Sequence, residues 1–268
     1  MSALPATIGR LSRVFLLAPL VQLTYRADAI VGLLEVASRI FLFTVLWTAV
    51  YAPGQTSGGL DVRGAITYSA LASLLVTGRA YPVDTFSERI HDGTIVYLFL
   101  RPVAPVPYFW GVHLGGMGYR AALLLFGGLI GIAAGVIEPP PSPLVLGAFV
   151  VSVVLAELIY GCFFLFLELV AFWTTNIWGV RSLYFFALQL LSGALVPIWF
   201  FPDWAVTILA WSPFAAATNT PVSIYVGRIA PDAVLGAIAI QVGWLIALVA
   251  LAQLLWRRAR DRVIVQGG

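Results

Sequence analysis

The sequence contains no lysine, because all fifteen of its basic residues are arginine. A phosphate-binding P-loop needs a lysine that contacts the phosphates, and a pyridoxal enzyme needs a lysine that forms the Schiff base. Neither kind of site can be built from this chain. We therefore expect no cofactor on the chain itself, and any ATP hydrolysis, with its ATP and Mg²⁺, must take place on a partner.

Cysteine and histidine are also scarce. Cys162 is the only cysteine, so an internal disulfide is excluded, and its place in an apolar run indicates a packing or lipid-facing role. His91 and His113 lie in different predicted elements, without the spacing of metal ligands. The sequence therefore predicts no metal site and no catalytic residue.

Charged residues make up only 10% of the chain, whereas hydrophobic residues make up 61%. A soluble domain carries roughly 25% charged residues, and the apolar runs here reach the roughly 20 residues that cross a bilayer. We predict an all-α membrane protein with a single transmembrane domain over residues 1–268, in contact with lipid and not with nucleic acid. The six predicted membrane-spanning helices cover residues 28–51, 62–80, 108–136, 144–172, 183–201 and 233–256.

The arginines predict the orientation of these helices. Eleven of them, including Arg79, fall on one side of the spans, and only Arg63 and Arg228 fall on the other, while Arg39 and Arg120 lie within spans. Positively charged loops stay in the cytoplasm. We therefore expect both termini to lie in the cytoplasm. The membrane is expected to be a bacterial inner membrane.

Small residues form a stripe on the second predicted span. Ala65, Ser69, Ser73 and Thr77 recur every four residues, a spacing that lets another helix approach closely. We keep Ser69 and Ser73 as candidates for a translocation path or gate as well as for packing. Trp47, near the end of the first span, is interpreted as an interfacial anchor.

The residue pattern after the second span, in the connection at residues 81–107, predicts a short amphipathic helix on the cytoplasmic surface. Pro82 suits a first helical turn and Gly93 suits a helix end. One face is apolar and the other is charged, although a solvated surface turn is the alternative. The candidate residues of this helix are Val83, Asp84, Phe86, Glu88, Arg89 and Ile90.

The connection before the last span is apolar but broken by prolines. Asp203 is expected to cap a helix from Trp204 to Trp211. Such a helix is about 12 Å long, too short to cross the membrane, so it must lie on or dip into the outer leaflet. We interpret the segment as an outer gate, with a purely structural cap as the alternative. The candidate gate residues are Pro197, Pro202, Trp204, Trp211 and Pro213.

Two carboxylates lie inside the fourth predicted span. Glu157 and Glu168 fall on one helix face, and buried membrane carboxylates are costly and usually functional. They are candidates for transport or gating, or they pair only with Arg120, Arg181 or a partner subunit.

Other polar residues within spans have simpler expected roles. Glu35 and Arg39, one helical turn apart, are expected to neutralise each other. Gln189, Gln241 and Gln253 are expected to bond across helices or, alternatively, to contact cargo, and Gln189 is kept as a path candidate.

Over nearly its whole length the chain resembles the permease subunits of type-2 ABC exporters. The resemblance covers an amphipathic N-terminal elbow helix within residues 1–27, six spans, a coupling segment at 81–107 and a broken outer helix pair at 202–227. The inner run at residues 92–102 is similar to the branch long labelled as domains of unknown function. The most specific outer residues are those at 192–197, 201–204, 211–213, 221 and 224–227.

The resemblance implies an alternating-access mechanism. Two permeases, like or unlike, would enclose a path for a hydrophobic or amphipathic compound, and two ATPase subunits would drive them through the coupling helix. Two other classes stay open. An ion- or proton-driven secondary transporter would use Glu157 and Glu168, but we find no inverted repeat. An intramembrane enzyme would need a cluster of catalytic groups, and none is visible.

Overall fold

The computed structural model describes residues 26–79, 86–100, 103–174 and 178–260. Its regular elements over these ranges are all helices, which confirms the all-α prediction. The expected elbow helix lies almost wholly outside the described residues. The helices are α2 (Arg26–Val50), α3 (Val62–Gly78), α4 (Phe86–His91), α5 (Val96–Leu100), α6 (Pro105–Gly115), α7 (Met117–Ala133), α8 (Pro143–Val170), α9 (Trp178–Leu191), η1 (Ile198–Phe200), α10 (Asp203–Ala210), α11 (Pro213–Ala217), α12 (Asn219–Tyr225) and α13 (Val234–Arg260).

Four segments of the described chain are long and apolar enough to cross a membrane. They are Val31–Val50, Pro105–Ala133, Pro143–Val170 and Val234–Arg260. The two other predicted spans correspond to shorter helices, because α3 has 17 residues and α9 has 14. The chain is therefore a multi-pass membrane protein.

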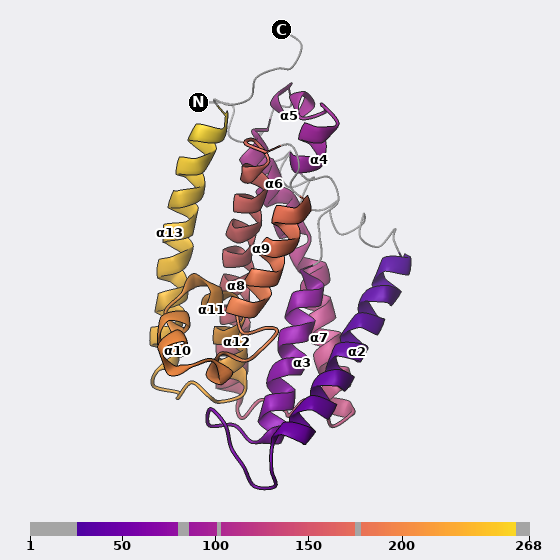
Figure 1. Ribbon diagram of the computed structural model, residues 1–268, viewed down its shortest axis with the longest axis vertical. Coiled ribbons are helices and arrows are strands. Elements are labelled where there is room, and N and C mark those ends of the chain that lie inside the picture. Colours follow the sequence, from indigo (N-terminus) through magenta and orange to yellow (C-terminus); the bar gives the residue numbers. More distant parts are fainter. Residues whose placement is uncertain (1–25, 80–85, 101–102, 175–177, 261–268) are drawn as a thin grey trace.

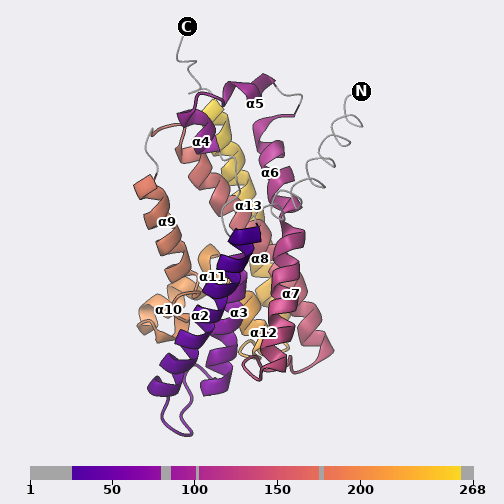
Figure 2. The same ribbon diagram turned by 90° about the vertical axis from the view of Figure 1, so that its right-hand side faces the viewer.

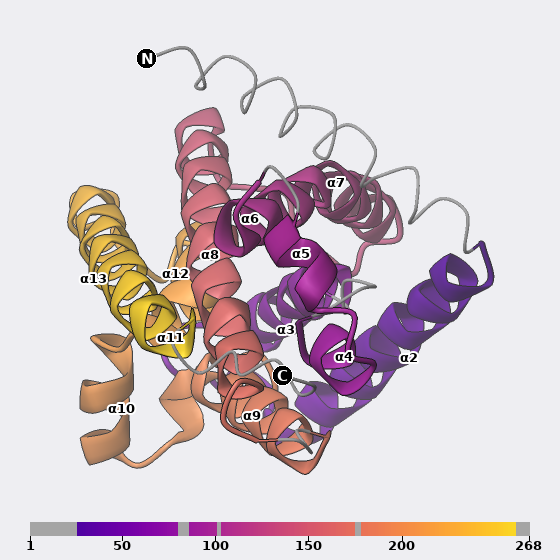
Figure 3. The ribbon, with the colours of Figure 1, turned by 90° about the horizontal axis from the view of Figure 1, so that it is seen from above.

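Helix α8 lies at the centre of the bundle. More than half of its apolar window, 56%, is buried inside the protein, against 11% for each of the three other candidate spans. It packs against α13, α12 and α11, while α3 packs against α2 and α7. Figures 1 and 2 show α4 and α5 at one end of the molecule and α10 and α12 toward the other. Seen from the α4 end, α8 runs between α13 and the group of α3, α6 and α7 (Figure 3).

The central helices begin where the sequence supplies capping residues. Asp61 precedes α3, and its Oδ1 accepts a hydrogen bond from the Gly64 amide at 2.9 Å. Ser142 caps α8 in the same way through Val145, and Pro143 occupies the first turn. Each cap satisfies an amide that the helix leaves without a partner.

The fifth predicted span is wrong in its second half. Helix α9 ends at Leu191, well before residue 201, and Gly193 adopts a φ of +79° that favours glycine. A Cβ at Gly193 would also lie 2.8 Å from the Tyr68 hydroxyl. That hydroxyl lies 3.1 Å from the Gly193 carbonyl oxygen, so α3 satisfies a backbone group that the helix break releases.

The small-residue stripe of α3 packs as predicted. Ala65, Ser69 and Ser73 are buried, and the indole of Trp47 in α2 donates to Ser69 Oγ at 2.8 Å. The interpretation of Trp47 as an interfacial anchor is wrong. Trp47 as a whole residue is only 4% exposed, and its ring stacks on Phe200 of η1 with 4.9 Å between ring centroids.

The segment predicted as an outer helix pair, residues 202–227, forms three short helices, α10, α11 and α12. The predicted cap at Asp203 is also wrong. Asp203 is the first residue of α10, whose N-cap is Pro202 without a side-chain hydrogen bond. The cap in this segment is Ser212, which accepts from the Ala215 amide and is followed by Pro213.

Candidate functional site

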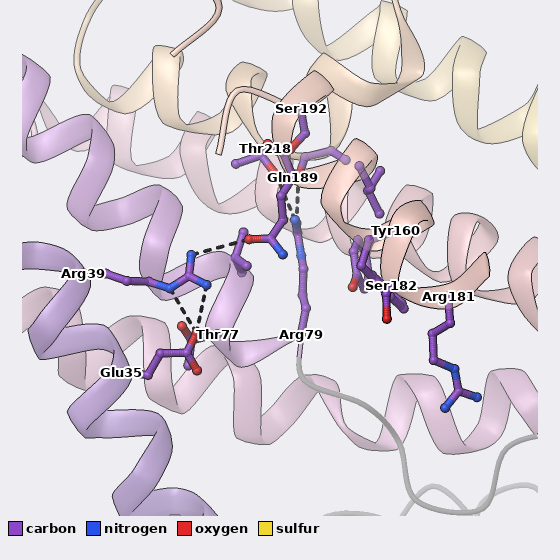
Figure 4. Close-up of a pocket in the computed structure, with 14 residues that line it drawn as sticks. Glu35, Arg39, Thr77, Arg79, Tyr160, Arg181, Ser182, Gln189, Ser192 and Thr218 are labelled. Carbon is purple, nitrogen blue, oxygen red and sulfur yellow. Dashed lines mark hydrogen bonds and ion pairs between the residues drawn. The ribbon is translucent and has the colours of Figure 1, made fainter. Parts of the chain in front are cut away.

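A cavity of about 490 Å³ lies among α2, α3, α8, α9 and the residues around the end of α11. This volume is within the range of small-molecule sites. Figure 4 shows its polar residues converging from several helices. The lining residues are Glu35, Arg39, Val76, Thr77, Arg79, Tyr160, Arg181, Ser182, Phe185, Leu188, Gln189, Ser192, Ala217 and Thr218.

Helix α2 contributes the pair that the sequence predicted. Arg39 Nε donates to Glu35 Oε1 at 3.0 Å, which confirms the expected neutralisation. A second guanidinium nitrogen of Arg39 lies 3.5 Å from Gln189 Oε1 in α9. Gln189 is therefore the one predicted path residue that lines this cavity, and it bridges the gap between α2 and α9.

Arg79 follows α3 and reaches into the protein interior. Its Nε donates to Glu157 Oε1 at 2.7 Å, and its terminal nitrogens donate to Thr218 Oγ1 at 3.0 Å and to the Ala217 carbonyl at 2.7 Å. The guanidinium also lies 4.7 Å from the centre of the Tyr160 ring. Arg79 was counted among the arginines that fall on one side of the spans, but its side chain is buried inside the protein.

Glu157 forms ion pairs with two arginines. Its second carboxylate oxygen lies 2.9 Å from Nε of Arg120, and Arg120 also donates to the His113 carbonyl at 2.6 Å. The pairing of Glu157 with Arg120 is therefore confirmed, but the sequence missed the stronger partner, Arg79. The three side chains carry two positive charges and one negative charge, all in a buried setting.

Glu168 belongs to a different cluster near α4. It accepts a hydrogen bond from the Ser87 amide at 3.1 Å and lies 3.8 Å from a guanidinium nitrogen of Arg181. Arg181 also donates to Ser87 Oγ at 2.6 Å. The predicted pairing of Glu168 with Arg181 is confirmed. Although Glu157 and Glu168 lie on the same helix, neither lines the cavity, and their transport role stays a prediction.

Helix α4 has the two faces that the sequence predicted. Phe86 is buried against Phe109 and Phe172, and Ile90 packs against the same cluster, while Glu88 is exposed. Gly93 ends the segment with a φ of +69°. Arg89 is half-buried, and Val83 and Asp84 lie outside the described residues.

The remaining candidates lie away from the cavity. Ser69 and Ser73 are buried between α2 and α3, and Pro197 is buried at the start of η1. Pro202, Trp204 and Trp211 are exposed and Pro213 is half-buried. Their path and gate roles stay predictions.

The sequence also missed a contact between residues of two connecting segments at the end opposite α4. Arg228 donates to the Gly58 carbonyl at 2.7 Å, and its guanidinium lies 4.5 Å from the centre of the Trp199 ring. Gly58 has a φ of +60°, and a Cβ there would lie 2.4 Å from Trp199. Sequence spacing carries no signal for a contact between such distant residues.

A helical membrane bundle around an open, charged cavity is typical of transport proteins. The family described as ABC-2 family transporter protein matches residues 33–267, so the chain belongs to this family. No curated protein and no solved structure matches the chain. Membership makes the protein the permease subunit of an ABC transporter, a multi-pass membrane protein that works with an ABC ATPase partner.

Proposed function

We propose that this permease belongs to an exporter of a bacterial inner membrane. It has six spans, a single transmembrane domain over residues 1–268 and both termini in the cytoplasm. Two copies, or one copy and a related permease, enclose a path for a hydrophobic or amphipathic compound, and two ATPase subunits hold the ATP and Mg²⁺. The observation that carries the proposal is α4, whose apolar face is seated in the bundle while Glu88 stays exposed.

Helix α4 connects the surface of the protein to the cavity. Its Ser87 is hydrogen-bonded to Glu168 of α8 and to Arg181 of α9, and Arg181 also lines the cavity. Phe86 anchors the same helix in an aromatic cluster. A displacement of α4 by the ATPase would therefore reach α9 directly, and α9 forms one wall of the cavity. This route explains how ATP hydrolysis on a partner changes the cavity.

The two short helices fit a six-span arrangement. At 1.5 Å per residue, α3 extends about 26 Å and α9 about 21 Å, against a hydrocarbon core of about 30 Å. Beyond α9, the chain continues through a turn and η1. In the turn, the Gly193 carbonyl accepts a hydrogen bond from the Tyr68 hydroxyl. Irregular backbone at membrane depth is tolerated when protein buries it. We assign η1 and α10 to α12 to the outer gate.

The test is association with an ABC ATPase from the same genome, by pull-down and by hydrolysis in reconstituted vesicles. Glu88→Arg, and Arg89→Glu on the same helix, should weaken association by changing the charge at the docking surface, and salt should modulate the effect. Phe86→Ala removes a buried aromatic ring, a change that costs about 3–5 kcal/mol in soluble cores. We expect this variant to assemble but to hydrolyse ATP without transport.

Asp203→Arg is the matched control, because it makes the same kind of charge change on an exposed acidic residue at the α10 end. It should leave ATPase association unchanged. Equal behaviour of all these variants would contradict the coupling role of α4. Transport by the purified chain without an ATPase would favour an ion- or proton-driven secondary transporter instead.

A further inference from the structure

The charges around the cavity do not balance among the described residues. Four arginines lie in or behind the cavity wall, and they pair with three carboxylates. The arginines are Arg39, Arg79, Arg120 and Arg181, and the carboxylates are Glu35, Glu157 and Glu168. Arg39 is paired with Glu35, and Arg181 with Glu168. The excess positive charge therefore belongs to the group in which Arg79 and Arg120 share Glu157. An uncompensated buried charge is costly, and Arg79 places this one in the cavity wall.

Hydrogen-bond donors gather where Arg79 enters the cavity. Figure 4 shows Arg39 reaching Gln189 from α2, and Arg79 extending into the same region toward Thr218. Gln189 uses its oxygen for Arg39, so its amide nitrogen is left as a donor on the cavity side. The hydroxyl of Thr218 lines the same region and accepts from Arg79, so its own proton is left to donate. Guanidinium, amide and hydroxyl groups together are a donor set that suits an anionic group.

The rest of the cavity wall includes apolar side chains. Val76 of α3 and Phe185 and Leu188 of α9 line it beside the polar residues. A ligand that fits both regions has a charged end and an apolar body. We infer that the cavity binds an amphipathic compound by its acidic group, a carboxylate or a phosphate, which pairs with Arg39 and is attracted by the buried positive charge of Arg79. This inference rests on the proposed function and names its substrate class.

Glu35 would compete with such a ligand for Arg39. The pair is partly exposed, with side-chain exposures of 28% for Arg39 and 47% for Glu35. An acidic ligand would replace Glu35 as the partner of Arg39. Removing the carboxylate should therefore favour the ligand, whereas removing the guanidinium should disfavour it.

The experiment measures binding of a radiolabelled alkyl phosphate to the full chain in phosphatidylcholine nanodiscs. Arg39→Gln should weaken binding about tenfold, the effect of losing one charge-assisted hydrogen bond. Glu35→Gln should strengthen it several-fold. Arg63→Gln is the matched control, because Arg63 is exposed near the start of α3, and it should have no effect. An alkyl carboxylate should compete, and an alkyltrimethylammonium of equal chain length should not.

Equal competition by the alkylammonium, or equal binding by Arg39→Gln and Arg63→Gln, would overturn the inference. Neither result would bear on ATPase association, which tests the proposed function separately. If ATPase association fails while acid-selective binding is retained, the proposed exporter function is wrong but the binding site for acidic compounds is supported. Phosphatidylglycerol in the nanodiscs identifies the source of the acidic group. Displacement of the probe indicates a phospholipid, and retention of the probe indicates a single-chain compound.

Discussion

At the scale of single residues, Glu157 is a buried carboxylate that contacts two buried arginines. Its carboxylate accepts a hydrogen bond from Arg79 and forms an ion pair with Arg120, and all three side chains are largely buried. A buried charge left without a partner is far more costly than a buried pair. The consequence of removing a charge here therefore depends on which charge is removed.

Glu157→Gln should be the most destabilising change in this cluster. It leaves two buried arginines without a carboxylate, and by analogy with soluble proteins the cost is about 3–5 kcal/mol. Arg120→Gln leaves Arg79 and Glu157 as a neutral pair, and we expect a cost of about 1–3 kcal/mol from the bonds that are lost. Thermal unfolding of the purified variants in detergent measures the difference. Equal losses for the two variants would contradict the shared role of Glu157.

The sequence predicted part of this cluster, and the missing part has a physical reason. An intramembrane carboxylate needs a buried cation, so Arg120 and Arg181 were reasonable partners for Glu157 and Glu168. Arg79 was not recognised, because it directly follows an apolar helix and its partner lies 78 residues away in the chain. Only the packing of α3 against the central region brings the two side chains together.

At the scale of elements, the short helix α11 depends on its neighbours. The last carbonyl groups of a helix have no partner within it, and in a membrane each such group is costly. The Ala217 carbonyl accepts from Arg79 at 2.7 Å, and the Ala216 carbonyl accepts from Gln241 of α13 at 2.8 Å. Gln241 also accepts from Ser152 Oγ at 2.8 Å. These side chains let a five-residue helix end inside the bundle.

Gln241→Leu should therefore destabilise the protein, by about 1–3 kcal/mol, because it leaves the Ala216 carbonyl without its partner. Gln253→Leu is the control on the same helix. Gln253 is exposed, whereas Gln241 is fully buried, so the control should be neutral or slightly stabilising in lipid. The two variants are compared by their melting temperatures in detergent. A larger loss for Gln253→Leu would show that the wrong glutamine was assigned to the packing role.

The sequence predicted the long helices better than the broken ones. Apolar runs that fill a span need only length and composition, and α2, α8 and α13 follow this rule. The end of α9 gave no such signal, because Ala194, Leu195 and Val196 continue the apolar run beyond Gly193. The break is fixed by the φ of Gly193 and by its contact with Tyr68, and a contact with another helix cannot be recognised from a local pattern.

At the scale of the whole molecule, the two ends of the bundle differ in construction. One end carries α4, tied to α8 and α9 through Ser87. At the other end, Arg228 connects two segments through its contacts with Gly58 and Trp199. Arg63 and Arg228 both lie at this second end. They are the two arginines that the sequence predicts on the other side of the spans. This polarity is what the proposed orientation requires, with α4 in the cytoplasm and α10 outside.

Cysteine labelling tests that orientation. The parent for it is Cys162→Ala, because Cys162 is fully buried among apolar side chains, and loss of its small side chain should cost only about 1 kcal/mol. Glu88→Cys and Asp203→Cys then place a single exposed thiol at each end. A membrane-impermeant maleimide added to intact cells should label Asp203→Cys and not Glu88→Cys, because basic loops stay inside. Both should react after the membrane is permeabilised, which controls for access. Labelling of Glu88→Cys in intact cells would place α4 outside, where no ATPase could reach it, and the six-span orientation and the coupling role would both be wrong.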